Sequence, residues 1–178
     1  FTLNKLMWIP RSRFFSFKNI VKTMDKFENV ISEVRSTNDT ESSEKIGNSK
    51  LFNSFIYFEA QVHIPVLYHP YYEGSNYYIL YFHGNAEDIG YASEFTRRLS
   101  TGLRVNVISV EYPGYGAYEG EANSKNILED AEIVFDFLTN EVGINPENIF
   151  VFGRSIGSGP ATHLAAQRNP GMLILMSP

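Results

Sequence analysis

The protein has 178 residues, 43% of them hydrophobic, which is enough for one domain with a substantial core. Its net charge of −5 gives no general attraction to nucleic acid, and the absence of cysteine excludes disulfides, thiolate metal ligands and a cysteine nucleophile. No apolar run approaches the roughly 20 residues of a membrane-spanning helix, and no secretory signal is recognisable.

The first 50 residues differ in composition from the rest of the chain. A basic and aromatic stretch over 11–22 is followed by a polar run over 36–50 that is typical of a linker or disordered loop. The basic-aromatic stretch predicts either peripheral contact with a membrane or docking on the folded part, and the sequence favours neither. We therefore expect an N-terminal segment over residues 1–50 and a folded portion over 51–178.

The second part alternates between short apolar runs and helical patterns. The expected strands cover 55–58, 60–68, 77–82, 105–110, 149–152 and 172–176. The expected helices cover 89–101, 124–142 and 158–167, with Ser124 as the predicted cap of the second. The last four strands, joined by three helical crossovers, predict a mostly parallel, doubly wound α/β sheet. Because the chain stops directly after about the sixth strand, we expect a fragment.

The segment Gly153-Arg154-Ser155-Ile156-Gly157 lies between an expected strand and an expected helix. This G-x-S-x-G pattern predicts a nucleophile elbow, in which a strained turn exposes the serine and glycines allow close approach of strand and helix. The simpler alternative is a glycine-rich turn that happens to contain a serine. The flanking elements favour Ser155 as the nucleophile. Arg154 faces either an anionic substrate or solvent.

A second strand end carries His83-Gly84-Asn85. Acyl transfer needs backbone N–H donors aimed at the developing oxyanion, one from such a loop and one from the residue after the nucleophile. The predicted donors are therefore the amides of Asn85 and Ile156. The catalytic histidine follows the serine in this arrangement, so we expect His83 to pack under the loop or hydrogen-bond it.

Other polar residues are assigned to the scaffold. Glu111 belongs to a turn rich in glycine and proline, and His163 lies two turns into the helix after the elbow. Asp130, Glu132 and Asp136 are expected on the solvated face of an amphipathic helix. No histidine has partners at metal-binding spacing, so no metal site is expected.

The motifs over 82–90, 111–116, 146–149 and 153–160 together resemble the α/β-hydrolase-domain (ABHD) proteins. The similarity spans about residues 57–178 and is greatest to the branch of depalmitoylating, membrane-associated enzymes. It implies a serine hydrolase of fatty-acyl thioesters of proteins, or of related lipid esters, that uses no cofactor. It also implies an acylated protein or lipid ester as the substrate, and an intracellular, peripheral-membrane or cytoplasmic location.

Two departures from the family pattern matter. The aspartate and histidine of the family triad follow later strands and are absent from this chain, so we expect the fragment itself to be nearly inactive. The N-terminal cysteine cluster of the depalmitoylating branch is also missing. Two alternatives therefore stay open: a catalytically inactive, hydrolase-like binding or regulatory module if the chain truly ends at Pro178, and a small-molecule or lipid esterase.

Overall fold

The computed structural model describes residues 5–11 and 63–178, without the side chains of Lys5 and Pro10. Four sequence-based predictions lie wholly or mainly outside these residues: the basic-aromatic stretch beyond Arg11, the polar run over 36–50, the segment boundary near residue 50 and the strand over 55–58.

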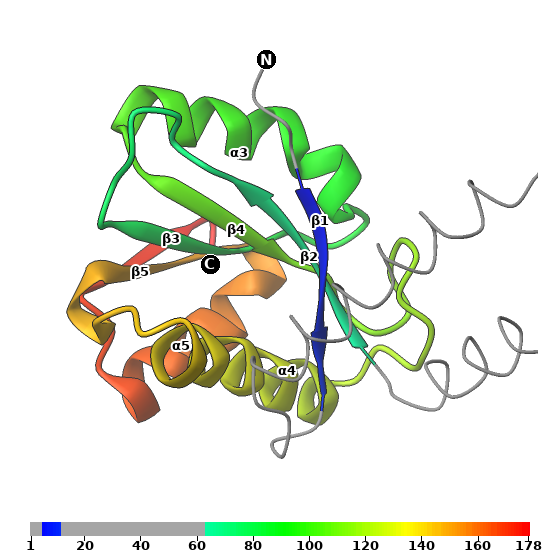
Figure 1. The fold of residues 1–178 in the computed structure, drawn as a ribbon. Helices are drawn as coiled ribbons and strands as arrows, with labels where there is room; N and C mark the ends of the chain where they lie inside the picture. Colours follow the sequence, from blue (N-terminus) through cyan, green and yellow to red (C-terminus); the bar gives the residue numbers. More distant parts are fainter. Residues whose placement is uncertain (1–4, 12–62) are drawn as a thin grey trace, which may run out of the picture. The chain divides into compact units, whose positions relative to one another are not determined.

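A six-stranded sheet organises the described residues (Figure 1). Its strands are β1 (Lys5–Pro10), β2 (His63–His69), β3 (Tyr78–Phe82), β4 (Asn106–Val110), β5 (Ile149–Arg154) and β6 (Met172–Met176). Their order across the sheet is β1-β2-β4-β3-β5-β6. Strands β3 to β6 run parallel to one another, whereas β1 is antiparallel to β2 and β2 to β4. The predicted mostly parallel sheet is therefore confirmed.

Strand β1 was not predicted from the sequence. It buries Ile9 and partly buries Met7, whereas Trp8 and Leu6 are about half exposed, at 48% and 54%. This alternation is regular, but the outward positions carry large apolar side chains, so the sequence shows no polar-apolar pattern. Residues 5–10 therefore belong to the sheet, although the sequence assigned them to an N-terminal segment.

Three helices connect the parallel strands: α3 (Ile89–Leu103), α4 (Ser124–Asp136) and α5 (Ser158–Arg168). A π-helical turn over Phe137–Glu141 continues α4. Helix α3 lies on one face of the sheet, and α4 and α5 lie on the other (Figure 1). Ser124 does not cap α4. The side chain of Asn123 does so by accepting the N–H of Asn126 at 2.9 Å, which leaves Ser124 as the first helical residue.

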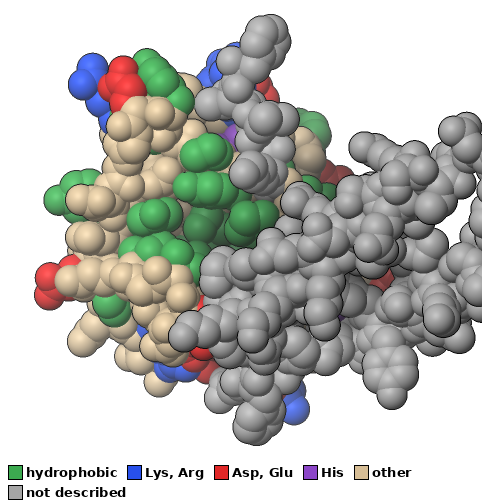
Figure 2. Space-filling model, in the orientation of Figure 1, with side chains coloured by type: hydrophobic (Ala, Val, Ile, Leu, Met, Phe, Trp, Pro, Cys, Tyr) green, Lys and Arg blue, Asp and Glu red, His purple; other side chains and the backbone are tan. Residues whose placement is uncertain are grey.

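Each face of the sheet has its own core, because successive strand residues point to opposite sides. In β3, Leu80 and Phe82 pack towards α4 and α5, whereas Ile79 and Tyr81 pack towards α3. Figure 2 shows hydrophobic side chains gathered over the middle of the visible face and charged ones towards its periphery. The two-sided covering agrees with a doubly wound sheet.

The order of the strands also determines where a site is formed. The chain crosses from β4 past β3 to β5, so the carboxyl ends of β3 and β5 are neighbours. In open α/β sheets, ligands bind where the strand order reverses in this way. Phe82 pairs with Gly153, and the loop after β3 therefore lies beside the elbow after β5.

Candidate active site

The predicted nucleophile lies in a strained turn at the end of β5. Ser155 begins a single 3₁₀ turn over Ser155–Gly157, directly before α5. Its φ of +51° lies in the left-handed region, which few residues other than glycine occupy and which costs of order 1–3 kcal/mol. Ser155 is also exposed. A strained, exposed serine between a strand and a helix is the geometry of a nucleophile elbow.

The two glycines of the elbow are required by backbone contacts. A Cβ atom at Gly153 would collide with the carbonyl of Gly157 one turn later. A Cβ at Gly157 would collide with the carbonyl of Phe82 at the end of β3. The close approach predicted from the sequence is therefore present, and it includes the neighbouring strand as well as the helix.

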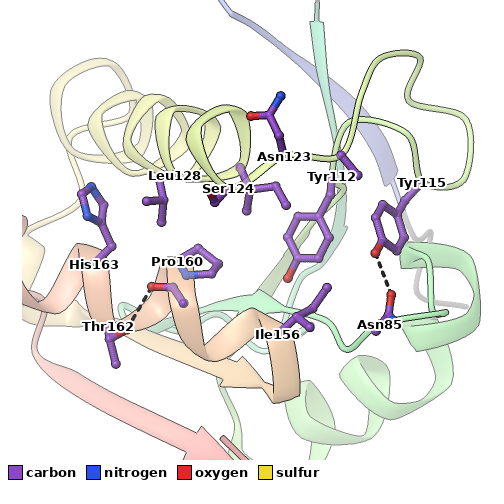
Figure 3. A pocket seen from close by; sticks show the side chains of 13 residues that line it. Asn85, Tyr112, Tyr115, Asn123, Ser124, Leu128, Ile156, Pro160, Thr162 and His163 are labelled. Atoms are coloured by element: carbon purple, nitrogen blue, oxygen red, sulfur yellow. Dashed lines mark hydrogen bonds between the residues drawn. The ribbon is translucent and has the colours of Figure 1, made fainter.

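The loop after β3 lies next to the elbow because of the register between the two strands. Asn85 and Ile156 line the same pocket. Figure 3 shows both towards the end of the pocket that lies opposite His163. Ile156 lies in the first turn after β5, where backbone N–H groups lack intrahelical acceptors. The side chain of Asn85 accepts a hydrogen bond from Tyr115 Oη at 2.8 Å. The two amides predicted for an oxyanion hole therefore belong to neighbouring segments.

His83 is fully buried beneath this loop. Its Nδ1 lies 3.0 Å from the carbonyl oxygen of Gly84, and its Nε2 lies 2.8 Å from Glu111 Oε1. Both ring nitrogens thus face acceptors inside the scaffold. This confirms that His83 hydrogen-bonds the loop, and its ring has no free nitrogen to offer Ser155.

Arg154, inside the elbow, forms an ion pair with Glu87. The other carboxylate oxygen of Glu87 accepts the N–H of Gly84 at 3.3 Å. The guanidinium therefore faces a carboxylate in the loop after β3. The sequence had suggested an anionic substrate or solvent as its neighbour, and neither interpretation included this ion pair. The two residues are 67 positions apart, and no local pattern in the sequence could have indicated their contact.

A family model described as alpha/beta hydrolase fold matches residues 79–178, more than half of the chain. The chain belongs to this family. The match includes both strand ends that carry the elbow and its neighbouring loop, and it confirms the fold inferred from the motifs.

Comparison with individual alpha/beta hydrolases agrees with this assignment. The chain is 39% identical over 104 residues to alpha/beta hydrolase domain-containing protein 17B of Homo sapiens, covering 58% of the chain and 36% of that protein. It is 39% identical over 105 residues to protein 17C of Xenopus tropicalis, covering 59% and 34%. The alignment thus spans about a third of each relative.

A solved structure shares the architecture. The alpha-beta hydrolase from Vibrio vulnificus matches with a TM-score of 0.51 and 27% identity, over 61% of this chain and 39% of that one.

Three acidic residues of α4 were predicted on its solvated face, and Asp130 differs most from that prediction. Asp130 was expected on the solvated face of α4 but is buried, with 1% exposure. It accepts a hydrogen bond from Tyr118 Oη at 2.8 Å and lies 2.6 Å from Arg11 Nε. Burial raises the pKa of Asp130, and Arg11 offsets part of that rise. The cation comes from the end of β1, which the sequence did not reveal as a strand.

Glu132 and Asp136 were predicted on the same solvated face of α4, but they are partly buried and bonded to α5. His163 Nε2 lies 2.6 Å from Glu132 Oε1, and Arg168 lies 2.9 Å from Glu132 and 2.8 Å from Asp136. These four side chains are all partly buried. His163 therefore takes part in a bridge between two helices, in agreement with the scaffold role predicted for it.

Within residues 5–11 and 63–178, no side chain hydrogen-bonds Ser155, and no three His, Asp or Glu side chains form a metal site. In the same part of the chain, no helix is both long and apolar enough to cross a membrane.

Proposed function

We propose that the protein is a serine hydrolase that cleaves fatty-acyl thioesters of proteins, or related acyl esters, through an acyl-enzyme on Ser155. The observation that carries this proposal is the strained, exposed conformation of Ser155 in a turn next to the loop that carries Asn85. Membership of the alpha/beta hydrolase family supports the reaction class. The motifs shared with the depalmitoylating branch support the acyl-thioester substrate.

The proposed reaction has two steps. Ser155 Oγ attacks the acyl carbon, a general base takes the hydroxyl proton, and the carbonyl oxygen becomes an oxyanion. The N–H groups of Asn85 and Ile156 donate to this oxyanion. The thiol or alcohol then leaves with the proton, and the acyl group remains on Ser155. Water attacks the same carbon by the same route, which releases the fatty acid and restores the serine.

The base is a residue other than His83 or His163. Both imidazoles are hydrogen-bonded to glutamates, His83 inside the core and His163 between α4 and α5. A serine without a base is a weak nucleophile, so a histidine positioned at Ser155 is a requirement of this proposal. A complete protein that lacks such a histidine would be a binding or regulatory module instead.

Hydrolysis of palmitoyl thioesters and palmitoyl oxygen esters by the complete protein tests this function. We expect turnover of both classes, with Ser155→Ala lowering kcat by at least about 10³-fold, the scale on which loss of a catalytic nucleophile acts. Preference for the thioester supports protein depalmitoylation, and preference for the oxygen ester supports a lipid esterase. Absence of turnover with every acyl substrate would contradict the enzyme and leave the binding module.

A further inference from the structure

A pocket of about 690 Å³ opens between the first halves of α4 and α5. In Figure 3, Asn85 and Tyr115 lie at one end of it and His163 at the other, with Leu128 and Ser124 on the α4 side and Pro160 on the α5 side. Its volume lies within the about 300–1,000 Å³ of typical small-molecule sites. The pocket therefore extends from the proposed oxyanion site into the space between two helices.

The arrangement of the helices explains why the pocket ends where it does. Both helices begin near the edge of the sheet that carries the elbow, and their first halves line the pocket, which is open to solvent. Towards the other end, Glu132 of α4 is bonded to His163 and Arg168 of α5, and Asp136 is bonded to Arg168. These ion pairs hold the two helices together and limit the length of the pocket.

The lining has the chemistry of an aliphatic ligand site. None of its thirteen residues is Lys, Arg, Asp or Glu, and its imidazole, His163, is bonded to Glu132. Three segments of the chain contribute apolar side chains to the lining. These side chains are Tyr112, Ile127, Leu128, Ile156 and Pro160. An anionic ligand finds no free cation in this lining, whereas a methylene chain finds apolar surface beginning at Ile156.

We propose that this groove between α4 and α5 binds the acyl chain of the substrate, with the chain running from Asn85 and Ile156 towards His163. The inference rests on the proposed function, because it takes the carbonyl carbon to lie at Ser155. Each buried methylene contributes up to about 0.8 kcal/mol, so the groove favours long chains over short ones. The bridge between His163 and Glu132 sets the upper limit of chain length.

Binding of fatty acids to the complete Ser155→Ala protein tests the groove without any catalytic step. Palmitate, octanoate and butyrate are used to displace a fluorescent long-chain fatty acid, and the affinity is expected to rise with chain length. Leu128→Trp and Ser124→Trp place an indole in the groove from α4 and are each expected to weaken palmitate binding at least tenfold. Lys125→Trp introduces the same side chain at an 82% exposed position outside the lining, and it is expected to leave binding unchanged.

Two results would overturn the proposal: no measurable binding of palmitate, or palmitate binding that neither groove variant weakens. The second result would mean that the acyl chain binds elsewhere on the protein. If the proposed function itself is wrong, the result differs: the complete protein hydrolyses neither short nor long acyl substrates. If only the groove is wrong, Leu128→Trp and Ser124→Trp cleave palmitoyl and butyryl substrates with the wild-type ratio of kcat/KM.

Discussion

Nε2 of His83 lies 2.8 Å from Oε1 of Glu111, and both side chains are buried at the carboxyl edge of the sheet. The pairing of Phe82 with Val110 brings these residues together, because each directly follows its strand. Glu111 also accepts the N–H groups of Tyr112 and Ile89, each at 3.1 Å. One carboxylate thus joins the end of β4, the loop after β3 and the start of α3.

Replacement of Glu111 by alanine is expected to destabilise the protein by about 3 kcal/mol or more. It leaves the N–H groups of Ile89 and Tyr112 and the Nε2 of His83 without their buried partner, and each unsatisfied group costs about 1–3 kcal/mol. Urea denaturation measures the loss. Glu119→Ala removes an exposed carboxylate from the same loop and is expected to change the free energy of unfolding by less than about 0.5 kcal/mol. Similar values for both variants would contradict the role of Glu111.

The ion pair between Arg154 and Glu87 is expected to position the loop that carries Asn85. Arg154→Glu and Glu87→Arg should each slow fluorophosphonate labelling of Ser155 by about fivefold, or roughly 1 kcal/mol, within the range of direct side-chain couplings. The double variant restores the pair with its charges exchanged and should recover most of the rate. Arg98→Glu, at a 75% exposed position on α3, is the control. Additive losses in the double variant would show that the pair has no positioning role.

The pairing of Arg11 with Asp130 predicts a pH-dependent effect on stability. In Arg11→Met the buried carboxylate loses its cation, and at neutral pH we expect a loss of about 2 kcal/mol, less than for a fully buried pair. Burial already raises the pKa of Asp130, and removal of Arg11 raises it further. As the pH falls and Asp130 takes up a proton, the difference between variant and wild type should shrink, because a neutral carboxyl needs no cation.

Urea denaturation at pH 5 and pH 7.5 measures that difference for Arg11→Met. Lys125→Met is the control: it removes an exposed cation from α4, the helix that carries Asp130, and should cost little at either pH. A penalty for Arg11→Met that grows on acidification would contradict the ionised state of Asp130 in the wild type.

Close backbone contact makes Gly157 intolerant of any side chain. Gly157→Ala should destabilise the protein by about 3 kcal/mol or more, because the added Cβ meets the rigid carbonyl of Phe82. Gly102 lies in α3 with no atom near the position of its Cβ, so Gly102→Ala should be neutral or stabilising. Thermal denaturation compares the two. Equal effects would contradict the close approach of β3 to the elbow.

Sequence patterns predicted the features of this site that depend on short segments. The elbow around Ser155 and the strands before Asn85 and Ser155 have local signatures: apolar runs ended by glycine-rich turns. The family resemblance then ordered these segments in one sheet. Asp130 shows the opposite case, since its burial depends on Arg11 at the end of a strand with no polar-apolar alternation.

Contacts between distant segments could not be predicted. Glu87 and Arg154 meet because β3 and β5 are neighbours, and strand order is a property of the whole sheet. The groove lined by Leu128 and Pro160 depends likewise on how two helices pack on one face. In both cases each residue alone looks like an ordinary surface or core position.

Covalent labelling tests the central claim, that Ser155 is the nucleophile, more directly than any other measurement. The complete protein is treated with a fluorophosphonate, and the modified peptide is located by mass spectrometry after digestion. The account predicts one adduct on Ser155 and none in Ser155→Ala, with the variant retaining the wild-type unfolding transition. An adduct on a different residue, or unchanged labelling of Ser155→Ala, would contradict it.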